Sequence, residues 1–329
     1  MTATALITGA EGQDARLLAR HLSDNGYRVI GLAKTVRSTC HNFHEIIEVD
    51  LCDKLMMHQI LAKYKPCEYY HLAAAHHSSE QKSTSQVRDE MLRVNVLSTE
   101  LVIDAVLSIV KNCRIFFAGS SKMYSVESGV TSITEDSILN PCSFYGLTKT
   151  ASAMLVREAR EKCGLWGVVG ILFNHESHYR GEQYLTRKVS KFVGEEVLRL
   201  KKPRRHSKKK RLAIGDLDAQ VDWSSASDFV RGFHTSLRAN SPRDYVFASG
   251  RLHTVKELIE VAFNVAGLDW TEYVVLFDGY TPNNTTGALV GDSGLAEEEL
   301  NWRREVTFEG LIGGMVRYDI ELCSQAMAL

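Results

Sequence analysis

The first half of the chain alternates short apolar runs with longer segments in which apolar residues recur at helical spacing. Each apolar run is bounded by turn-forming or polar residues, which is typical of a buried strand. We interpret as strands residues 5–8, 28–33, 45–50, 68–74, 114–119 and 168–173. The amphipathic segments between them, which we expect to be helices, include residues 16–25, 54–64, 91–110 and 145–162. This alternation predicts an α/β fold with a doubly wound parallel sheet, which binds ligands at the carboxyl ends of its strands.

After about residue 175 the pattern changes to shorter mixed elements. We expect helices at residues 186–200, 225–238, 255–266 and 307–323, and a strand at residues 245–249. The sequence therefore predicts a parallel-sheet (Rossmann) domain at residues 1–175. Residues 176–329 should form a smaller mixed α/β cap that binds the substrate and sends some chain back to the sheet.

Composition places the chain among globular proteins. Of its 329 residues, 44% are hydrophobic and 24% are charged. With 39 Lys+Arg and 40 Asp+Glu the net charge is −1, which argues against general adhesion to nucleic acid or anionic lipid. No apolar run reaches the roughly 18 residues of a membrane span, and seven cysteines without C-x-x-C spacing favour a reducing compartment. We therefore expect a cytoplasmic protein. The basic run at residues 201–211 indicates a solvated loop or, alternatively, a site for a phosphate-bearing ligand or polyanion.

A glycine-rich turn follows the first predicted strand. Residues 9–15 read Gly-Ala-Glu-Gly-Gln-Asp-Ala, and a helical segment follows directly. Glycines let the backbone approach a pyrophosphate, and the free N–H groups and dipole of a helix N-terminus hold its negative charge. The spacing has alanine where close packing of helix on sheet often requires a third glycine. Its place between strand and helix predicts a dinucleotide-binding loop rather than an ordinary tight turn.

The loop after the second predicted strand bears on the choice of dinucleotide. NAD enzymes commonly place a carboxylate there for the ribose 2′-hydroxyl, whereas this chain has Lys34 and Arg37 among several hydroxyl side chains. Two cations suit a 2′-phosphate, so we expect NADP rather than NAD; the alternative is that both are solvated surface cations. Asp50 ends the third predicted strand, where it would meet the adenine.

Tyr145 and Lys149 form a Y-x-x-x-K pair at the start of a predicted helix. Residues i and i+4 share a helix face, so we expect the ammonium beside the phenol. A neighbouring cation would lower the pKa of Tyr145 from about 10 toward neutrality and make it a usable general base. Ser120 follows the fifth predicted strand, where its hydroxyl would bond to the reacting oxygen.

The glycine loop, the serine after the fifth strand and the Y-x-x-x-K pair, in this order, resemble the extended short-chain dehydrogenase/reductase family. Further strings narrow the resemblance to its GDP-mannose 4,6-dehydratase branch, and the similarity runs from about residue 5 to residue 322. These strings are Ile-Leu-Phe-Asn-His-Glu-Ser at 171–177, Arg-Gly at 180–181, Thr-Arg-Lys at 186–188, Leu-Asp-Ala at 217–219, Asp-Trp at 222–223, Gly-Asp at 291–292 and Leu-Asn-Trp at 300–302.

The resemblance implies a set of site residues by position. Tyr145 and Lys149 would be the catalytic pair, with Ser120 in place of the family's threonine. The residues implied to bind the cofactor, besides that pair, are Gly9, Gly12, Gln13, Asp14, Lys34, Arg37, Asp50, Leu51, Leu72, Ala73, Ala74, His175 and Arg180. The residues that we expect to bind the substrate are His77, Asn174, Glu176 and Lys188. In this family the sugar 4-hydroxyl is oxidised, water is lost across C5–C6 with help from a glutamate, and hydride returns to C6.

Lys122 is the first departure from the family's pattern, because it replaces that glutamate among the candidate catalytic residues. A lysine cannot act as a carboxylic acid. Either a buried, uncharged lysine or another carboxylate such as Glu176 would have to take over. Otherwise the chemistry stops at C4 and gives a 4-epimerase, 4-ketoreductase or 4-dehydrogenase; epimerases of the wider family carry serine without glutamate at this strand end.

The second departure concerns the pyrophosphate of a nucleotide sugar. An arginine that clamps it in the family is Val221 here, and a second arginine is missing from residues 281–286, which include Pro282. Because a charge-assisted hydrogen bond contributes roughly 1.5–3 kcal/mol, loss of both should weaken nucleotide binding. The basic run at residues 201–211 would replace them or indicates a different anionic substrate.

Three hypotheses for the function follow. The leading one is an NADP-dependent enzyme that oxidises C4 of a nucleotide sugar, with either dehydration or C4-only chemistry. The others are a related enzyme acting on a non-nucleotide anionic substrate and a cofactor-binding protein with little catalysis. We expect a small-molecule substrate, no nucleic acid or membrane partner and, by analogy, a homodimer or homotetramer. No metal site is expected, because His71, His76 and His77 lack acidic or cysteine companions; His76 and His77 would line the cleft.

Overall fold

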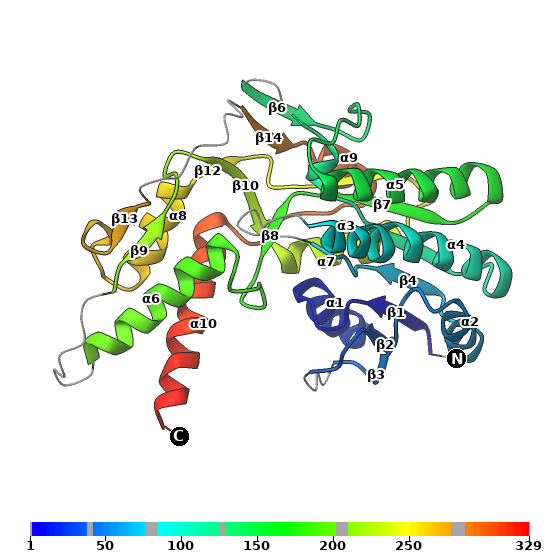
Figure 1. Cartoon of the computed structure of the whole chain (residues 1–329), viewed down its shortest axis with the longest axis horizontal. Helices are drawn as coiled ribbons and strands as arrows, with labels where there is room; N and C mark the ends of the chain where they lie inside the picture. Colours follow the sequence, from blue (N-terminus) through cyan, green and yellow to red (C-terminus); the bar gives the residue numbers. More distant parts are fainter. Residues whose placement is uncertain are drawn as a thin grey trace.

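The computed structural model describes residues 2–37, 42–76, 84–125, 129–201, 210–277 and 287–328. It consists of a larger and a smaller lobe that lie side by side (Figure 1). The larger lobe, which we call the sheet lobe, holds a long parallel sheet and the helices that cover it. The smaller one, the cap lobe, is built around α6, α8 and α10. Strands β8 and β10 lie between the two lobes.

Within the described ranges, the sheet lobe contains a seven-stranded parallel sheet with the order β11-β7-β5-β4-β1-β2-β3. All the strands expected from the first half of the chain are present, so the predicted doubly wound α/β fold is confirmed. Strand β11 comes from beyond residue 175 and pairs with β7. In chain order the strands are β1 (Thr4–Thr8), β2 (Arg28–Ala33), β3 (Glu45–Glu48), β4 (Glu68–His71), β5 (Arg114–Ala118), β7 (Gly167–Leu172) and β11 (Tyr245–Phe247).

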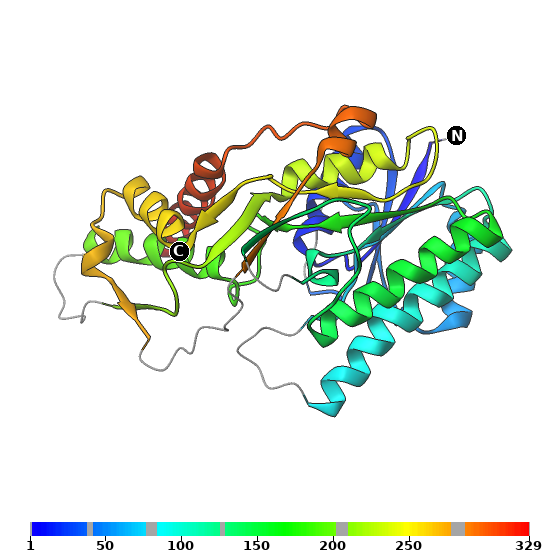
Figure 2. The same ribbon diagram turned by 90° about the horizontal axis from the view of Figure 1, so that it is seen from above.

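Helices cover both faces of this sheet (Figure 2). Because successive strand residues point to opposite faces, Leu6 packs in the core under α2, α4 and α5, whereas Ala5 and Ile7 pack under α1 and α7. The expected helix at residues 91–110 starts earlier and contains a π-helical turn, η1. The helical elements of this lobe are α1 (Gln13–Asp24), α2 (Lys54–Tyr64), α3 (Ser85–Met91), η1 (Leu92–Leu97), α4 (Ser98–Ile109), η2 (Ser121–Met123), α5 (Phe144–Cys163), α7 (Ala226–Ser236) and α9 (Gly294–Glu299).

The cap lobe has an apolar core of its own between α6, α8 and α10. Its elements are α6 (Leu185–Lys201), β9 (Leu212–Ile214), α8 (Val255–Val265), η3 (Trp270–Glu272), β13 (Val274–Leu276) and α10 (Phe308–Ala328). The pairing of β11 and the packing of α7 place parts of the second half of the chain in the sheet lobe. The division of the chain into two domains at residue 175 stays a prediction. In the described part of the chain, no helix combines the length and the apolar character needed to cross a membrane.

Short strands lie where the lobes meet, and the buried carboxylate of Asp222 connects the segments next to them. Strand β10 pairs with β8 and β12, and β6 pairs with β14. Asp222, on β10, accepts backbone hydrogen bonds from Ser249 (2.7 Å), Gly250 (3.1 Å) and Gly291 (3.2 Å). Burial raises the pKa of the Asp222 carboxyl. The short strands are β6 (Gly129–Ile133), β8 (Asn174–Glu176), β10 (Gln220–Ser225), β12 (Leu252–Thr254) and β14 (Gly287–Gly291).

Candidate active site

The glycine loop lies at the carboxyl end of β1, against the segment that follows β4. Gly9 has a φ of +74°, and a Cβ on it would lie 3.1 Å from the Cα of Ala73. A Cβ on Gly12 would lie 3.1 Å from the carbonyl oxygen of Gly9. The Gly9 N–H donates to the carbonyl of Leu32 at 2.9 Å, which fixes the loop to β2. Gly12 is also the N-cap of α1 and offers no side chain to its first N–H groups, so the loop presents backbone donors to an anion.

The first turn of α1 is bonded to strand β8. The amide of Gln13 donates to the carbonyl of His175 at 2.8 Å and accepts from Ser177 at 2.9 Å. The two ring nitrogens of His175 lie 2.9 Å from Asp14 Oδ2 and 2.7 Å from the carbonyl oxygen of Phe173. A doubly protonated ring satisfies both acceptors.

The charges of this Asp14–His175 pair stabilise each other. Burial by itself lowers the pKa of His175, but the Asp14 carboxylate outweighs it and the pKa is raised. Conversely, the imidazolium outweighs the burial of Asp14 and lowers the pKa of its carboxyl. The predicted cofactor residues Gln13, Asp14 and His175 are therefore brought together.

The predicted 2′-phosphate residues lie at the carboxyl end of β2. Arg37 is exposed, and its backbone N–H donates to Glu11 of the glycine loop at 3.0 Å. The Lys34 ammonium is exposed and pairs with Glu90 at 2.8 Å, a contact that raises the pKa of Lys34. Asp50, exposed beyond β3, pairs with Arg93.

The remaining predicted cofactor residues line the same edge of the sheet. Leu51 is partly buried next to Asp50, and Leu72 and Ala73 donate backbone hydrogen bonds to the Thr8 hydroxyl at 3.0 and 2.9 Å. Ala74 follows them and is exposed.

Tyr145 and Lys149 lie on α5, next to the end of β5. The Lys149 ammonium is buried, donates to the carbonyl of Ala118 at 2.8 Å and lies 5.9 Å from the centre of the Tyr145 ring. Burial lowers the pKa of Lys149 to about 7. Burial also raises the pKa of Tyr145 well above its ordinary value, reinforced by Tyr184 and opposed by Arg180 and the Ser120 hydroxyl. The lowered phenol pKa expected from the Y-x-x-x-K spacing is thus not found, because desolvation dominates and the ammonium is bonded to a carbonyl.

Lys122 follows Ser120 in η2, and its side chain is exposed. The burial that an uncharged lysine would require is therefore missing. Its backbone, by contrast, is tightly packed: a Cβ on Gly146 would overlap the carbonyl oxygen of Lys122. The N–H of Lys122 donates to the Ser120 hydroxyl oxygen at 3.1 Å. Glycine next to Tyr145 is thus needed for α5 to approach the turn that carries Ser120.

Glu176 is a buried carboxylate at the end of β8. Thr186 donates to its Oε2 at 2.7 Å, and Nε of Arg180 lies 3.2 Å from the same oxygen. Burial raises the pKa of Glu176 even though Arg180 opposes this shift. The guanidinium of Arg180 stacks over the ring of Tyr184 at 3.6 Å. Glu176, which is ion-paired with Arg180, therefore belongs to a group of side chains that extends to Tyr184.

The other residues predicted to bind the substrate lie in several parts of the chain. The amide of Asn174, on β8, lies 3.5 Å from the carbonyl oxygen of Asp222. Lys188 is exposed on α6, and its ammonium lies 3.4 Å from the carbonyl oxygen of Ala213. His77, Pro282 and most of the basic run lie outside the described residues. Val221, at the position of a family arginine, is partly buried on β10.

Asn95 is a site residue that the sequence reasoning missed. It lies in η1, where its amide accepts from the N–H of Ala75 at 2.8 Å and donates to the carbonyl of Ala75 at 3.1 Å. It also donates to Thr148 of α5 at 2.9 Å. Asn95 lies between Val94 and Val96, and a polar residue between two apolar ones in a predicted helix is the signal that would have identified it. It ties the segment after β4 to the helix that carries Tyr145.

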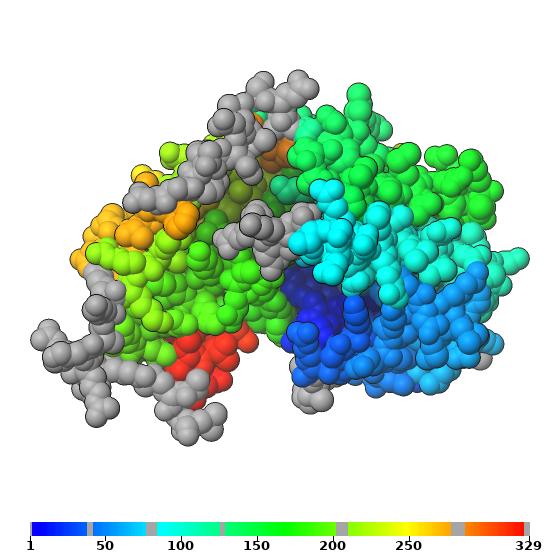
Figure 3. Space-filling model, in the orientation of Figure 1, coloured from blue at the N-terminus to red at the C-terminus, as the bar shows by residue number. Residues whose placement is uncertain are grey.

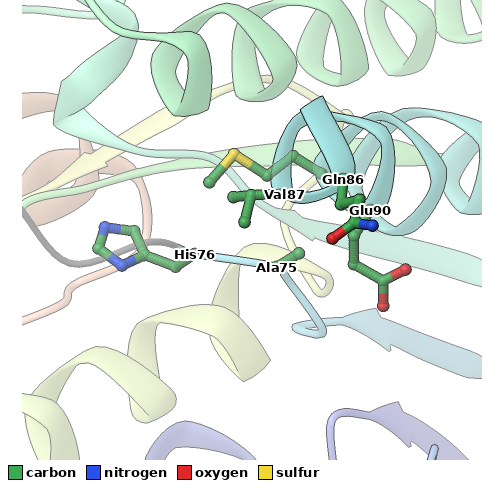
Figure 4. A pocket seen from close by; sticks show the side chains of 6 residues that line it. Ala75, His76, Gln86, Val87 and Glu90 are labelled. Carbon is green, nitrogen blue, oxygen red and sulfur yellow. The ribbon is translucent and has the colours of Figure 1, made fainter. Parts of the chain in front are cut away.

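His76 and Tyr184 were also absent from the predicted catalytic set, and they flank Tyr145. The His76 ring contacts the Tyr145 ring edge-on, with centroids 4.6 Å apart, and its Nδ1 lies 3.2 Å from the Tyr184 hydroxyl. His76 lines a cavity of about 270 Å³ between the segment after β4 and α3 (Figure 4). The surface is hollowed between the blue N-terminal residues and the green segment of the cap lobe (Figure 3). Among the described residues, no three His, Cys, Asp or Glu side chains are grouped to hold a metal ion.

Comparison with known proteins gives one family description for nearly the whole chain. Residues 6–315 match the sequence profile of GDP-mannose 4,6 dehydratase. The chain is 32% identical to GDP-mannose 4,6 dehydratase 2 of Arabidopsis thaliana, covering 99% of this chain and 89% of that protein. It is 30% identical to the GDP-mannose 4,6 dehydratase of Homo sapiens, covering 97% and 91%.

Solved structures show the same fold at lower identity. A dTDP-glucose 4,6-dehydratase from Bacillus anthracis, solved in complex with NAD, superposes with a TM-score of 0.79 at 15% identity and covers 96% of each chain. The profile match spans nearly the whole length, and it includes the strings on which the resemblance to extended short-chain dehydrogenase/reductases rests. The chain therefore belongs to the GDP-mannose 4,6 dehydratase family.

Proposed function

We propose that this chain oxidises the C4 hydroxyl of a nucleotide-activated sugar, with NADP as the electron acceptor. The observation that carries the proposal is the placement of Tyr145, Ser120 and Lys149 around the carboxyl end of β5, on the sheet edge that also bears the glycine loop. The GDP-mannose 4,6 dehydratases among its relatives support a nucleotide sugar as the substrate class.

The glycine loop and the start of α1 fit the pyrophosphate of a dinucleotide. Side chains at Gly9 and Gly12 would crowd the loop, so it keeps an open backbone surface beside the uncapped helix N-terminus. The similarly folded dTDP-glucose 4,6-dehydratase, solved with NAD, supports a nicotinamide dinucleotide. When bound, the nicotinamide supplies a two-electron acceptor for the oxidation of an alcohol carbon.

Arg37 and Lys34 support NADP over NAD. The backbone N–H of Arg37 donates to Glu11, which places Arg37 next to the glycine loop. Its side chain is exposed there, where a 2′-phosphate would lie. Lys34 would exchange the carboxylate of Glu90 for the phosphate. Position 34, where NAD enzymes often carry an acidic residue, is a lysine.

The catalytic residues divide the proton chemistry between them. Tyr145 takes the proton of the sugar hydroxyl at its phenolate oxygen, and Ser120 donates a hydrogen bond to the same sugar oxygen. Lys149, when charged, favours the phenolate electrostatically. Its pKa of about 7 means that small changes in solvation determine how much of this help is present near neutral pH.

The exposed side chain of Lys122 favours a second candidate, in which the reaction ends at C4. Without a carboxylate at this position, the neighbouring C5 proton has no acceptor from the turn after β5. The buried Glu176 is the carboxylate that would restore dehydration, and its raised pKa suits an acid–base role. The two candidates therefore differ in whether Glu176 reaches the sugar.

The products distinguish these candidates. Purified protein is incubated with GDP-mannose and other nucleotide sugars, and the products are identified by NMR while NADPH is followed by absorbance. A 6-deoxy-4-keto product without net NADPH change supports dehydration, and Glu176→Gln should then abolish it. A C4 epimer or stoichiometric NADPH change supports C4-only chemistry, and Lys122→Glu should then introduce elimination. Bound cofactor with no turnover of any nucleotide sugar would contradict the proposal and favour a non-nucleotide substrate or a binding role.

A homodimer or homotetramer is part of the proposal. Leu97 of η1 and both Leu147 and Met154 of α5 are large apolar side chains with 41%, 51% and 57% of their area exposed, respectively. Such residues on the outer helices are suited to contact a second copy. Sedimentation analysis of the wild type and of Leu147→Glu tests this; a wild-type monomer would contradict it.

A further inference from the structure

The first turn of α1 lies against strand β8, which leads into the turn that carries Arg180. Within the described ranges, β8 is an outer strand of the three-stranded sheet β12-β10-β8 and pairs with β10 only. An outer strand has backbone N–H and C=O groups that need other partners. The amide of Gln13 is such a partner, because it donates to the carbonyl of His175 at 2.8 Å. A side chain of α1 therefore supplies a donor to the backbone of this outer strand.

Gln13 has a second partner in the residue that follows β8. The Ser177 hydroxyl donates to Oε1 of Gln13 at 2.9 Å, and its oxygen accepts from the N–H of Tyr179 at 3.1 Å. The carbonyl of Ser177 accepts from the N–H of Arg180 at 3.0 Å. Gln13 is buried, and both polar atoms of its amide are used in these contacts. The first turn of α1 is therefore bonded both to β8 and to the turn after it.

Asp14 forms a third link between α1 and β8. Its Oδ2 lies 2.9 Å from Nε2 of His175, and the His175 ring stacks on Phe229 of α7 with the centroids 4.5 Å apart. A carboxylate in the first turn of a helix would repel a phosphate that binds at the helix N-terminus. The His175 imidazolium offsets this repulsion. Asp14 is therefore better suited to hold His175 than to contact a phosphate.

These three links hold the segment that carries Glu176 and Arg180. Glu176 lies between His175 and Ser177, the two residues that the side chains of α1 contact. Its carboxylate accepts from Thr186 at 2.7 Å and lies 3.2 Å from Nε of Arg180. The glycine loop leads directly into α1. A shift of β8 relative to α1 would therefore move the Glu176–Arg180 pair relative to the glycine loop.

We propose that Gln13 and Asp14 are positioning residues, which keep the Glu176–Arg180 pair at a fixed place relative to a dinucleotide bound at the glycine loop. This inference rests on the proposed function, in which that dinucleotide oxidises a nucleotide sugar. It gives the two side chains a role different from the cofactor contact that the sequence led us to expect. Neither side chain touches the substrate in this scheme, because both act through β8 and the turn after it.

The first test separates positioning from cofactor binding. Gln13→Met removes both hydrogen bonds and keeps a side chain of similar length, so β8 should lose its fixed place while the glycine loop keeps its backbone. We expect kcat at saturating NADP to fall about tenfold to hundredfold, and the Kd of NADP to stay within about threefold of the wild-type value. Gln59→Met, at an exposed glutamine of α2, is the matched control and should change neither quantity.

Two results of this test would overturn the proposal. An unchanged kcat in Gln13→Met would show that the bonds to β8 do not matter for the reaction. A rise of about tenfold or more in the Kd of NADP would show that the side chain binds the cofactor, whatever happens to kcat. Ser177→Ala removes the bond to Gln13 from the side of β8 and should give the same split between kcat and Kd. It decides the question if Gln13→Met does not fold.

The second test needs no turnover. Hydrogen exchange of residues 174–180 is followed by mass spectrometry in the wild type and in Gln13→Met, with and without NADP. Because α1 connects the glycine loop to β8, NADP should slow the exchange of these residues in the wild type, and at least about threefold less in Gln13→Met. Equal slowing in the two proteins would overturn the proposal.

The positioning role and the proposed function fail in different ways. If the wild type binds NADP but converts no nucleotide sugar, the proposed function fails, and exchange with NADP still decides the role of Gln13. If the wild type binds neither NADP nor NAD, exchange without dinucleotide decides whether Gln13 holds β8. It should then be faster at residues 174–180 in Gln13→Met, and equal rates would overturn the link. If Tyr145→Phe is inactive while Gln13→Met is fully active, only the positioning role fails.

Discussion

The sheet lobe and the junction with the cap lobe build their parts of the site in different ways. In the sheet lobe the backbone determines most of the site's geometry. Its main features are Gly9 at a φ of +74°, Gly12 as the N-cap of α1 and Gly146 packed against the carbonyl of Lys122. At the junction, side chains contact one another: Glu176 accepts a hydrogen bond from Thr186 and forms an ion pair with Arg180. Backbone geometry depends on individual glycines and their immediate packing, whereas a side-chain group depends on partners contributed by several segments.

This difference explains how the chain departs from its family. A site made of backbone tolerates replacement of neighbouring side chains, and the glycine loop keeps its form although its third glycine position is Ala15. A side-chain site is sensitive to replacement of a single partner, and Val221 on β10 is a junction position where the sequence led us to expect a departure from the family. We therefore expect cofactor binding to be robust and substrate chemistry to be sensitive to single substitutions.

Tyr145→Phe is the strongest test of that expectation. Removing the phenolic oxygen removes the group that takes the sugar proton, so kcat should fall by about 10²–10⁴-fold. Cofactor affinity, measured by fluorescence titration, should stay within about twofold, because the glycine loop and α1 are untouched. Turnover at the wild-type rate would contradict the assignment of Tyr145 as the base.

Gly146→Ala tests how far the backbone determines the sheet lobe's part of the site. A methyl group there would overlap the carbonyl oxygen of Lys122, so α5 must shift away from Ser120. We expect unfolding free energy to fall by about 1–3 kcal/mol and kcat to fall at least tenfold. Gly314→Ala is the matched control, because Gly314 lies on α10 of the cap lobe and a Cβ there would meet nothing within 4 Å. It should stabilise the protein by about 0.5–1 kcal/mol without changing kcat. Equal effects of the two substitutions, measured by urea denaturation and kinetics, would refute the argument.

The same distinction, between local backbone patterns and side-chain partners from distant segments, separates what could be predicted from the sequence and what could not. The strands, the glycine loop and the pairing of Tyr145 with Lys149 on one helix are local patterns, and they could be read from residue spacing. The pKa of Tyr145 was predicted in the wrong direction, because spacing does not show that burial dominates or that Lys149 is bonded to Ala118. Asn95 and the β6–β14 pair were missed because their partners are distant in sequence.

Arg37→Ala tests whether the cofactor-binding part of the site selects NADP over NAD. If Arg37 binds a 2′-phosphate, losing one charge-assisted contact of roughly 1.5–3 kcal/mol should weaken NADP binding about tenfold to hundredfold. NAD binding should change by less than about twofold. Arg20→Ala, which removes an exposed arginine paired with Asp24 on α1, should alter neither. Calorimetric titration of both dinucleotides measures this, and an equal loss for NAD and NADP would show that Arg37 does not select the cofactor.

Acid should act differently on the stability of the two regions. Burial lowers the pKa of His71 and of His234, both in the sheet lobe, from 6.5 to about 3. Between those values the unfolded chain binds protons that the folded chain does not, so the free energy of unfolding falls as pH falls. The slope is about 1.4 kcal/mol per pH unit for each histidine when fully developed.

Glu176 and Asp222, at the junction, have the opposite sign. Burial raises their pKa, so the folded form binds protons more readily, and their contribution to stability grows as pH falls through the raised pKa. Hydrogen exchange at pH 7 and pH 5, corrected for intrinsic rates, should therefore show loss of protection first in β4 and α7. His234→Asn should reduce the pH dependence of unfolding by up to about 1.4 kcal/mol per pH unit. An identical slope in this variant would mean that His234 is protonated equally in both states, and the sheet lobe would then have no special sensitivity to acid from this residue.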